Sequence, residues 1–251
     1  MVIQQINNEI YRQYGDRWYT AQDDPVALLR AESKLKTPWV LEQIRENKGT
    51  NILDVGCGGG LLTNALGLEG LNVTGVDISP ECLDVARQHD LTRNITYLVA
   101  NAYQLPFLED QFDVVTAMDF LEHVERPDLI IEEIARVLKP NGVLLFHTIN
   151  RNLITWFIVL KLLPFLVKNT PSNMHLYRLF ITPKELTHYC TSAEMQVQKM
   201  IGIRPVFSST PLRSYFTGIF SDKMRFKTIK SLIFSYMGSA RKNSNALRSD
   251  Q

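Results

Sequence analysis

Two carboxylates and an imidazole stand within five residues of one another in the segment "MDFLEHV" (118–124). They belong to Asp119, Glu122 and His123, which follow an apolar run typical of a buried strand. Side chains of these types in a cleft can act as a general base, or they can ligate a divalent metal ion. The alternative is an ordinary acidic face at the start of a helix.

A second segment, "LDVGCGGG" (53–60), places four glycines directly after an apolar run. Glycine costs conformational entropy, so a cluster of this kind indicates a tight strand-to-helix turn, a ligand lying against bare backbone, or both. The segment has the pattern D-x-G-x-G-x-G, from Asp54 to Gly60. The carboxylate of Asp54, at the end of the strand, can attract a positively charged group of a ligand.

This glycine turn does not have the dinucleotide-binding fingerprint G-x-G-x-x-G, whose third glycine packs the helix against the strand. Counting from Gly56 puts Leu61 at the third position, and counting from Gly58 puts Thr63 there. The sequence therefore disfavours a nicotinamide-dependent oxidoreductase, the first rival interpretation.

Alternating apolar runs and helical patterns must position these residues. The predicted strands span 51–56, 71–77, 95–100, 112–119 and 143–150, and the predicted helices span 26–46, 61–70, 79–90 and 127–142. Ser79 is the predicted N-cap of the third helix, and Pro140 and Gly142 are expected to end the fourth. Strands that alternate with helices imply right-handed crossovers and a parallel sheet covered on both faces.

The regular alternation of predicted strands and helices ends after residue 150. The run 153–167 is strongly apolar, Thr182 is the predicted cap of a further helix, and 195–203 and 226–240 supply two more strands. The predicted fold class is α/β: a Rossmann-like, seven-stranded, mostly parallel sheet with helices on both faces, plus an inserted apolar helical segment after the fifth strand. In open parallel sheets, ligands bind beyond the carboxyl ends of the strands.

Composition and charge argue against a nucleic-acid partner and against a cysteine-based metal site. The chain has 251 residues and a formal net charge of +1, which gives no electrostatic reason to expect nucleic acid. Its three cysteines are widely spaced and have no metal-binding pattern, which favours a reducing compartment. The first residues have neither a basic nor an apolar region, so no signal peptide is predicted.

The ordered segments resemble those of class I S-adenosylmethionine-dependent methyltransferases. The glycine turn matches the family's first motif, Asp77 ends the second strand, and "NAYQLPF" (101–107) resembles the family's "DA..LPF". "FDVVTAMDFLEHV" and "LKPNGVLLF" match its fourth and fifth strands. The resemblance implies that Asp77 accepts both ribose hydroxyls and that Asn101, in place of the usual acid, borders the adenine. The implied cofactor-binding residues are Asp54, Gly56, Cys57, Gly58, Gly60, Asp77, Ile78, Asn101, Ala102 and Met118.

A closer resemblance covers nearly the whole chain. "DFLEHV", "HTINRN" (147–152) and "MHLYRLFITPKEL" (174–186) are similar to "E.LEHV", "STLNRN" and "THD..KF..P.EL" of the polyprenyl-quinone O-methyltransferases of ubiquinone biosynthesis. "YMGSARK" and "DRWY" also match. The resemblance implies O-methylation of a small aromatic acceptor, a prenylated catechol, and a divalent metal ion such as Mg²⁺. The implied metal ligands are Asp119, Glu122, His123 and Asn150.

The chain departs from this family's motifs at a few positions. "AESKLK" (31–36) replaces "INP.R", so the arginine for the cofactor carboxylate is missing and Lys34 or Lys36 is the candidate cation. His147 stands where the family has serine, and Leu176 where it has an acid. The implied catalytic residues are His123, Asp119, Glu122 and His147. The alternative to a metal ion that activates the acceptor hydroxyl is a general base, either His123 or His147.

The apolar run 153–167 carries a further expectation. It has fifteen residues, fewer than the roughly 20 needed to span a bilayer. Trp156 and Phe157, flanked by Arg151 and Lys161, suit a helix lying on a membrane surface, where a prenyl tail would reside. The alternatives are a lid packed on the core and a dimer contact. A cytoplasmic location with a contact at the inner membrane surface is expected.

The chain is interpreted as a single methyltransferase domain over 1–251. Its parts are an N-terminal helical lid (1–46), a cofactor-binding core (51–150), the apolar insertion (151–181), the C-terminal part of the sheet (182–240) and a disordered tail (241–251). Two other functions stay open at this point: a methyltransferase for another phenolic, lipid or natural-product acceptor, and a non-catalytic protein that only binds S-adenosylmethionine.

Overall fold

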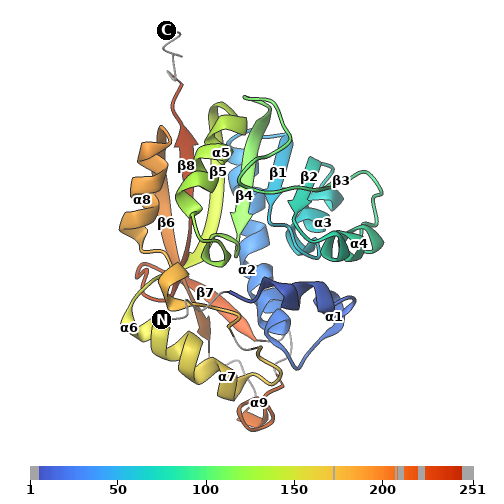
Figure 1. The fold of residues 1–251 in the computed structure, drawn as a ribbon, viewed down its shortest axis with the longest axis vertical. Coiled ribbons are helices and arrows are strands. Elements are labelled where there is room, and N and C mark those ends of the chain that lie inside the picture. The colour runs from blue at the N-terminus through green and yellow to red at the C-terminus, as the bar shows by residue number, and fades with distance from the viewer. Residues whose placement is uncertain (1–5, 172, 207, 209–211, 220–223, 245–251) are drawn as a thin grey trace.

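The computed structural model describes residues 6–171, 173–206, 208, 212–219 and 224–244. In these residues the core is one twisted sheet with the strand order β3-β2-β1-β4-β5-β8-β6-β7 (Figure 1). β1 to β5 pair in parallel, and β8, β6 and β7 continue the sheet in antiparallel pairs. The architecture is therefore Rossmann-like and mostly parallel, with an antiparallel edge.

The elements follow one another in the predicted alternation. The strands are β1 Asn51–Val55, β2 Asn72–Asp77, β3 Thr96–Val99, β4 Phe112–Met118, β5 Leu138–Ile149, β6 Met195–Val206, β7 Arg225–Ile229 and β8 Ser235–Lys242. The α-helices are α1 Arg17–Thr20, α2 Pro25–Glu46, α3 Leu61–Leu68, α4 Pro80–Gln88, α5 Pro127–Val137, α6 Leu153–Thr155, α7 Leu163–Leu166, α8 Pro183–Ser192 and α9 Leu212–Thr217. Tighter or wider helical turns are η1 Asn8–Gln13, η2 Leu121–His123, η3 Trp156–Leu162 and η4 Tyr177–Leu179.

The predicted helix caps form. The Ser79 hydroxyl accepts a hydrogen bond from the Cys82 amide at the start of α4 (3.2 Å). Thr182 and Glu185 make a reciprocal capping box at the start of α8. Each cap satisfies amide groups that have no partner within the first helical turn.

The end of α5 was predicted wrongly. The helix ends at Val137, and Pro140 and Gly142 lie inside β5 rather than ending the helix. Leu138 pairs with Phe112 of β4, and the register shifts before Val143 pairs with Val114. The shift accommodates the proline, which cannot donate to a strand ladder.

The count of seven strands was also wrong, since the described residues form eight. The segment 226–240 contains parts of two strands, because bends between Ile229 and Ser235 separate β7 from β8. β8 then inserts between β5 and β6. Arg241 and Lys242, expected in a disordered tail, belong to β8, and residues 245–251 lie outside the described part of the chain.

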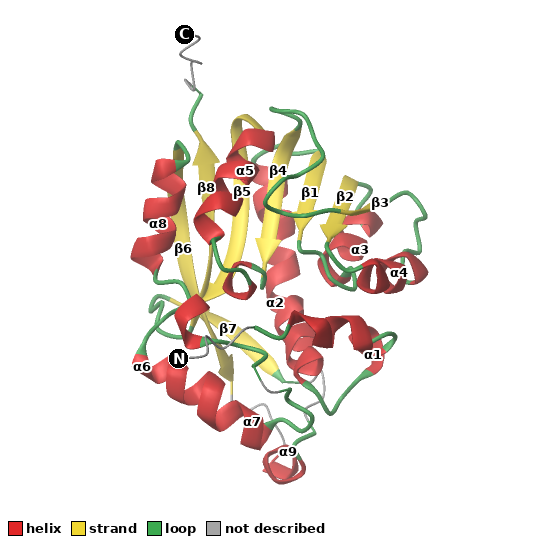
Figure 2. Cartoon of the chain, in the orientation of Figure 1, coloured by secondary structure: helices red, strands yellow, loops and turns green. Residues whose placement is uncertain are grey.

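Helices cover both faces of the sheet, as Figure 2 shows, and each face is apolar. On one face, Val40 and Ile44 of α2 and Leu66 of α3 pack against Ile52 and Val114. On the other face, residues of α5 and α8 pack against alternate positions of the same strands, among them Leu53 and Val115. Side chains of a strand point alternately to opposite faces, so both faces of the central strands are apolar.

A cap of helices lies beyond the carboxyl ends of β1, β4 and β5. Figure 1 shows η1, α1 and the start of α2 on one side of this cap and the helix formed by α6, η3 and α7 on the other. None of the described helices is both long and apolar enough to cross a bilayer. The cap closes the edge of the sheet at which ligands of such folds bind.

Candidate active site

One cavity of about 430 Å³ lies between the cap and the carboxyl ends of the strands. Most of the predicted site residues line it: Asp54, Gly56, Cys57, Gly58, Asp77, Ile78, Met118, Asp119, Glu122, His123 and His147. Four of the predicted residues are not in its lining: Gly60, Asn101, Ala102 and Asn150. The chain thus gathers residues from four strand ends at one place.

Hydrogen bonds join Asp77, at the end of β2, to the glycine turn after β1. The two carboxylate oxygens of Asp77 accept hydrogen bonds from the Gly58 and Ser79 amides, each at 2.9 Å. The indole of Trp18, in α1, lies so close that a Cβ on Gly59 would come within 2.5 Å of it. Bare backbone is therefore required here by the cap itself.

Asp54 is buried beside the turn, and Cys57 is partly buried there. The Asp54 oxygens accept hydrogen bonds from the hydroxyls of Thr63 and Thr116, both at 2.6 Å. Burial raises the pKa of Asp54 to about 6, and burial and the nearby acids raise the pKa of the Cys57 thiol well above its usual value. Cys57 is therefore a small turn residue rather than a thiolate nucleophile.

Asn101 lies in an exposed turn. Its side-chain oxygen accepts a hydrogen bond from the Tyr103 amide (3.0 Å), so the side chain holds its own turn. The contact with an adenine amino group stays a prediction.

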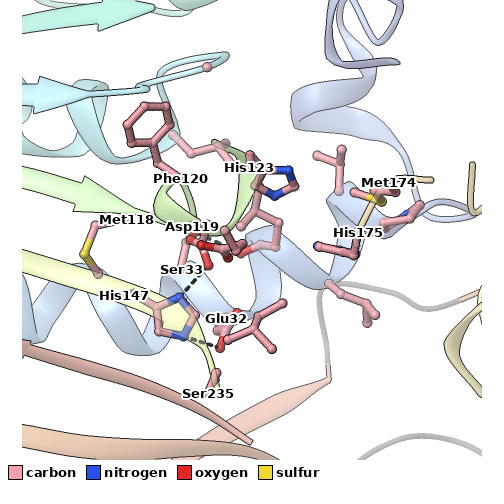
Figure 3. Close-up of a pocket in the computed structure, with 18 of the residues that line it drawn as sticks. Glu32, Ser33, Met118, Asp119, Phe120, His123, His147, Met174, His175 and Ser235 are labelled. Atoms are coloured by element: carbon pink, nitrogen blue, oxygen red, sulfur yellow. Dashed lines mark hydrogen bonds and ion pairs between the residues drawn. The ribbon is translucent and has the colours of Figure 1, made fainter. Parts of the chain in front are cut away.

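A buried charged cluster fills the floor of the cavity, where β4 and β5 end. Asp119, directly after β4, has a left-handed backbone (φ 55°), which is strained for a residue with a Cβ. One carboxylate oxygen lies 2.6 Å from Nδ1 of His147, and the other contacts the ammonium of Lys36. Lys36 also lies 3.3 Å from Glu32, one helical turn earlier in α2. Nε2 of His147 is 3.4 Å from a carboxylate oxygen of Glu32. Figure 3 marks this pair with a dashed line.

The charges in this cluster stabilise one another. Burial alone would raise the pKa of Asp119, but Lys36 and His147 hold it well below its usual value. Burial lowers the pKa of Lys36, yet Asp119 and Glu32 outweigh that and raise it. Burial and Lys36 lower the pKa of His147, and Asp119 and Glu32 again leave it raised. The imidazole is therefore oriented by a carboxylate that stays ionised.

Glu122 points to a different partner. Its carboxylate accepts a hydrogen bond from the Thr148 hydroxyl (2.9 Å), and the side chain is buried. Burial and the charge of Asp119 raise its pKa to about 7. Asn150 is turned away from the cavity, since its amide donates to the Leu232 carbonyl (2.7 Å).

His123 packs among aromatic rings. Its ring stands edge-on to Tyr11 of η1, with Nε2 3.4 Å from the Tyr11 hydroxyl, and its centroid is 5.2 Å from that of His175. Burial lowers the pKa of His123 to about 3 and that of His175 to about 4. Both rings are neutral at pH 7, and both line the cavity (Figure 3).

The four predicted metal ligands do not gather around one point. In the part of the chain that the structure describes, the one group of three ligand atoms within 4.8 Å of one another belongs to Glu32, Asp119 and His147. The ammonium of Lys36 lies among these carboxylates. Carboxylate and imidazole donors suit a divalent ion, but a cation already lies between them, so the residues do not fit one.

Sequence reasoning did not place Glu32 in the site, and it left Lys34 and Lys36 undecided. The structure separates the two lysines, because Lys34 is exposed and Lys36 is buried in the cavity wall. The four-residue spacing of Glu32 and Lys36 on a helix was a signal for their ion pair. His175 and Tyr11 were also missed, since only the tertiary fold brings them to His123.

Comparisons with known proteins show the class of protein to which the chain belongs. Residues 53–146 match the family described as "Methyltransferase domain". The ubiquinone biosynthesis O-methyltransferase of Pasteurella multocida is 35% identical over 206 residues, which are 76% of this chain and 84% of that protein. The protein of the same name from Actinobacillus pleuropneumoniae serotype 7 is 37% identical over 185 residues, 71% of this chain and 78% of that protein.

A solved structure shares the fold. Magnesium protoporphyrin IX methyltransferase from Synechocystis, with bound S-adenosylhomocysteine, superposes with a TM-score of 0.63 over 94% of this chain and all of that one, at 18% identity. The fold, the glycine turn and the acid at the end of β2 define an S-adenosylmethionine-dependent methyltransferase. Within that class, the chain belongs to the ubiquinone biosynthesis O-methyltransferase family.

Proposed function

We propose that the chain methylates a hydroxyl of a prenylated catechol, an intermediate of quinone biosynthesis. The observation that carries this proposal is the division of one cavity into two halves. Its polar half contains the glycine turn, Asp77 and the cluster around Asp119 and His147. Its other half is apolar. The names of the relatives support the same acceptor class.

The apolar half lies between α2, the helix of residues 153–166 and the antiparallel edge of the sheet. Its lining includes Leu28, Ile158, Val159, Leu162, Leu163, Leu166, Val167, Met224 and Phe226. Several of these residues also pack together as one apolar cluster around Val167 and Met224. An apolar tail attached to an aromatic ring would be removed from water here, while the ring's hydroxyls face His147.

The polar half suits the cofactor. The bare backbone of Gly56 and Gly58 lines the cavity, and the Asp77 carboxylate, which the Gly58 and Ser79 amides hold in place, has lone pairs left for ribose hydroxyls. Asp54 lies beside the turn, where an ammonium group would find a carboxylate. Bound S-adenosylmethionine supplies a methyl group on a positively charged sulfur.

His147 is the proposed base. S-adenosylmethionine bound in the polar half would supply its methyl group to the acceptor oxygen and leave as the neutral thioether, and Nε2 of His147 would take up the hydroxyl proton. That atom makes no hydrogen bond among the described residues, although a Glu32 carboxylate oxygen lies 3.4 Å away, and Asp119 holds the other ring nitrogen. His123 is a weaker base, because burial lowers its pKa to about 3. The cavity walls position the two reactants and exclude water.

An acceptor series tests the proposal. With labelled S-adenosylmethionine, kcat/KM is expected to rise at least tenfold for each isoprene unit added to a catechol, up to the length that the cavity holds, because each buried CH₂ contributes about 0.8 kcal/mol. Val159→Trp, which narrows the apolar half, should remove this rise and leave the rate with unprenylated catechol nearly unchanged. Equal kcat/KM for all chain lengths would contradict a prenylated acceptor.

We further propose that the helix of residues 153–166 contacts the membrane surface. One side of it lines the cavity, while Leu153, Phe157 and Phe165 are 77%, 54% and 85% exposed on the other. Lys161 lies over the Trp156 ring, 5.4 Å from its centroid. Large apolar groups with a cation and an indole are typical of an interfacial helix.

Liposome flotation tests this contact. The wild-type protein is expected to float with anionic vesicles, and the Trp156→Asp, Phe157→Asp double variant should stay at the bottom, because burying two carboxylates in the interface is unfavourable. Leu91→Asp, which alters an exposed leucine outside this helix, is the matched control and should float like the wild type. A wild-type protein that stays at the bottom would rule the contact out.

A further inference from the structure

A lysine lies buried where charged and titratable side chains from three different segments meet. The Lys36 side chain is only 4% exposed, and its ammonium contacts the carboxylates of Asp119 and Glu32. α2 brings Glu32 and Lys36 to this place, the turn after β4 brings Asp119, and β5 brings His147. An ammonium has three donors, so it can satisfy both carboxylates at once.

If the lysine is left aside, the carboxylates of Glu32 and Asp119 and the imidazole of His147 are arranged like the ligands of a metal ion. One ligand atom each from Glu32, Asp119 and His147 lies within 4.8 Å of the others, and no other group of three in the described ranges does so. Nε2 of His147 is buried and has no hydrogen-bond partner among those residues. Two carboxylates and an imidazole are donors that divalent ions accept.

Several of the departures from the family's motifs meet at this one place. Glu32 and Lys36 lie in "AESKLK", which replaces "INP.R", Asp119 replaces the glutamate of "E.LEHV", and His147 replaces the serine of "STLNRN". In the structure these four residues are in mutual contact. They therefore form one unit in which an acid, a base and a cation come together.

We propose that the ammonium of Lys36 takes the place of a divalent metal ion in this site, so that the chain binds no such ion there and needs none for methyl transfer. A divalent ion bound to Glu32 and Asp119 would lie within a few ångströms of the ammonium, and their repulsion is strong in a buried place. Lys36 instead supplies the positive charge within the chain. It is a positioning residue, since its ammonium contacts one carboxylate oxygen of Asp119 while the other oxygen lies 2.6 Å from Nδ1 of His147.

Metal binding by cofactor-free protein tests the proposal, with Mn²⁺ as the probe in calorimetry and electron paramagnetic resonance. The wild type is expected to show no site up to millimolar Mn²⁺. Lys36→Ala leaves the three ligands without their cation and should bind one Mn²⁺ at least a hundredfold more tightly than the wild type. Adding Glu32→Gln to Lys36→Ala should remove most of this gain. Lys34→Ala, which alters an exposed lysine of the same helix, should behave like the wild type.

Circular dichroism and thermal melting establish that each variant is folded, and Lys36→Met, which fills the same space, replaces Lys36→Ala if that variant fails to fold. The wild type should retain full methyl transfer in the presence of a chelator. One Mn²⁺ bound tightly by the wild type and lost in Asp119→Asn would overturn the proposal. So would a folded Lys36 variant that binds Mn²⁺ no better than the wild type, or wild-type activity that a chelator abolishes and Mg²⁺ restores.

These outcomes are separate from those for the proposed acceptor. A protein that is inactive on every catechol under all conditions would contradict the proposed function, and the Mn²⁺ titrations would still decide the role of Lys36.

Discussion

His147→Gln is expected to lower kcat by about 10²–10⁴-fold, the usual contribution of a positioned general base. The imidazole is 2% exposed, Nδ1 is 2.6 Å from an Asp119 carboxylate oxygen, and Nε2 is left without a hydrogen-bond partner among the described residues. Glutamine keeps a polar group of similar reach but cannot take up the hydroxyl proton. Steady-state rates with a prenyl catechol measure the loss.

The second histidine of the cavity provides the comparison. His123→Gln removes an imidazole that burial keeps neutral, with a pKa of about 3, so its effect on kcat should be much smaller. Calorimetry should give both variants the wild-type affinity for S-adenosylmethionine, which separates loss of the base from loss of cofactor. A larger loss in His123→Gln than in His147→Gln would transfer the role of base to His123.

Asp77→Ala should weaken the binding of S-adenosylmethionine at least tenfold. Two charge-assisted hydrogen bonds to ribose hydroxyls contribute about 1.5–3 kcal/mol each. The substitution also releases the Gly58 and Ser79 amides, which Asp77 now holds at 2.9 Å, so the glycine turn loses its anchor to β2. Both effects act in the same direction, and isothermal calorimetry measures their sum.

The control for this variant is an acid at the surface of the following helix. Asp84, on α4, has a side chain that is 68% exposed and pairs with Arg87, so Asp84→Ala should leave cofactor affinity unchanged. Circular dichroism should show that Asp77→Ala keeps its fold. If a folded Asp77→Ala binds the cofactor as tightly as the wild type, Asp77 does not hold the ribose.

Much of the fold was predictable because its signals are local. The strands β1 to β4 begin and end within about two residues of their predicted bounds, since a buried parallel strand reads as a short apolar run between turn signals. The antiparallel edge was less predictable. Whether 226–240 is one strand or parts of two depends on how β7 and β8 pair with β6, and pairing partners far apart in sequence leave no local pattern.

The sequence by itself determined the class of this protein. The glycine turn, Asp77 after the second strand and the ordered strand motifs are local in sequence, so their resemblance to the family's motifs indicated a methyltransferase without coordinates. The tertiary structure alone decided the partners of the candidate site residues. Glu122 and His123 stand beside Asp119 in sequence, yet Asp119 pairs with Lys36 and His147, while the other two turn to Thr148 and Tyr11. The physical reason is that a 3₁₀ turn after a strand sends consecutive side chains in different directions, and α2 and β5 bring distant charges to the one that faces the cavity.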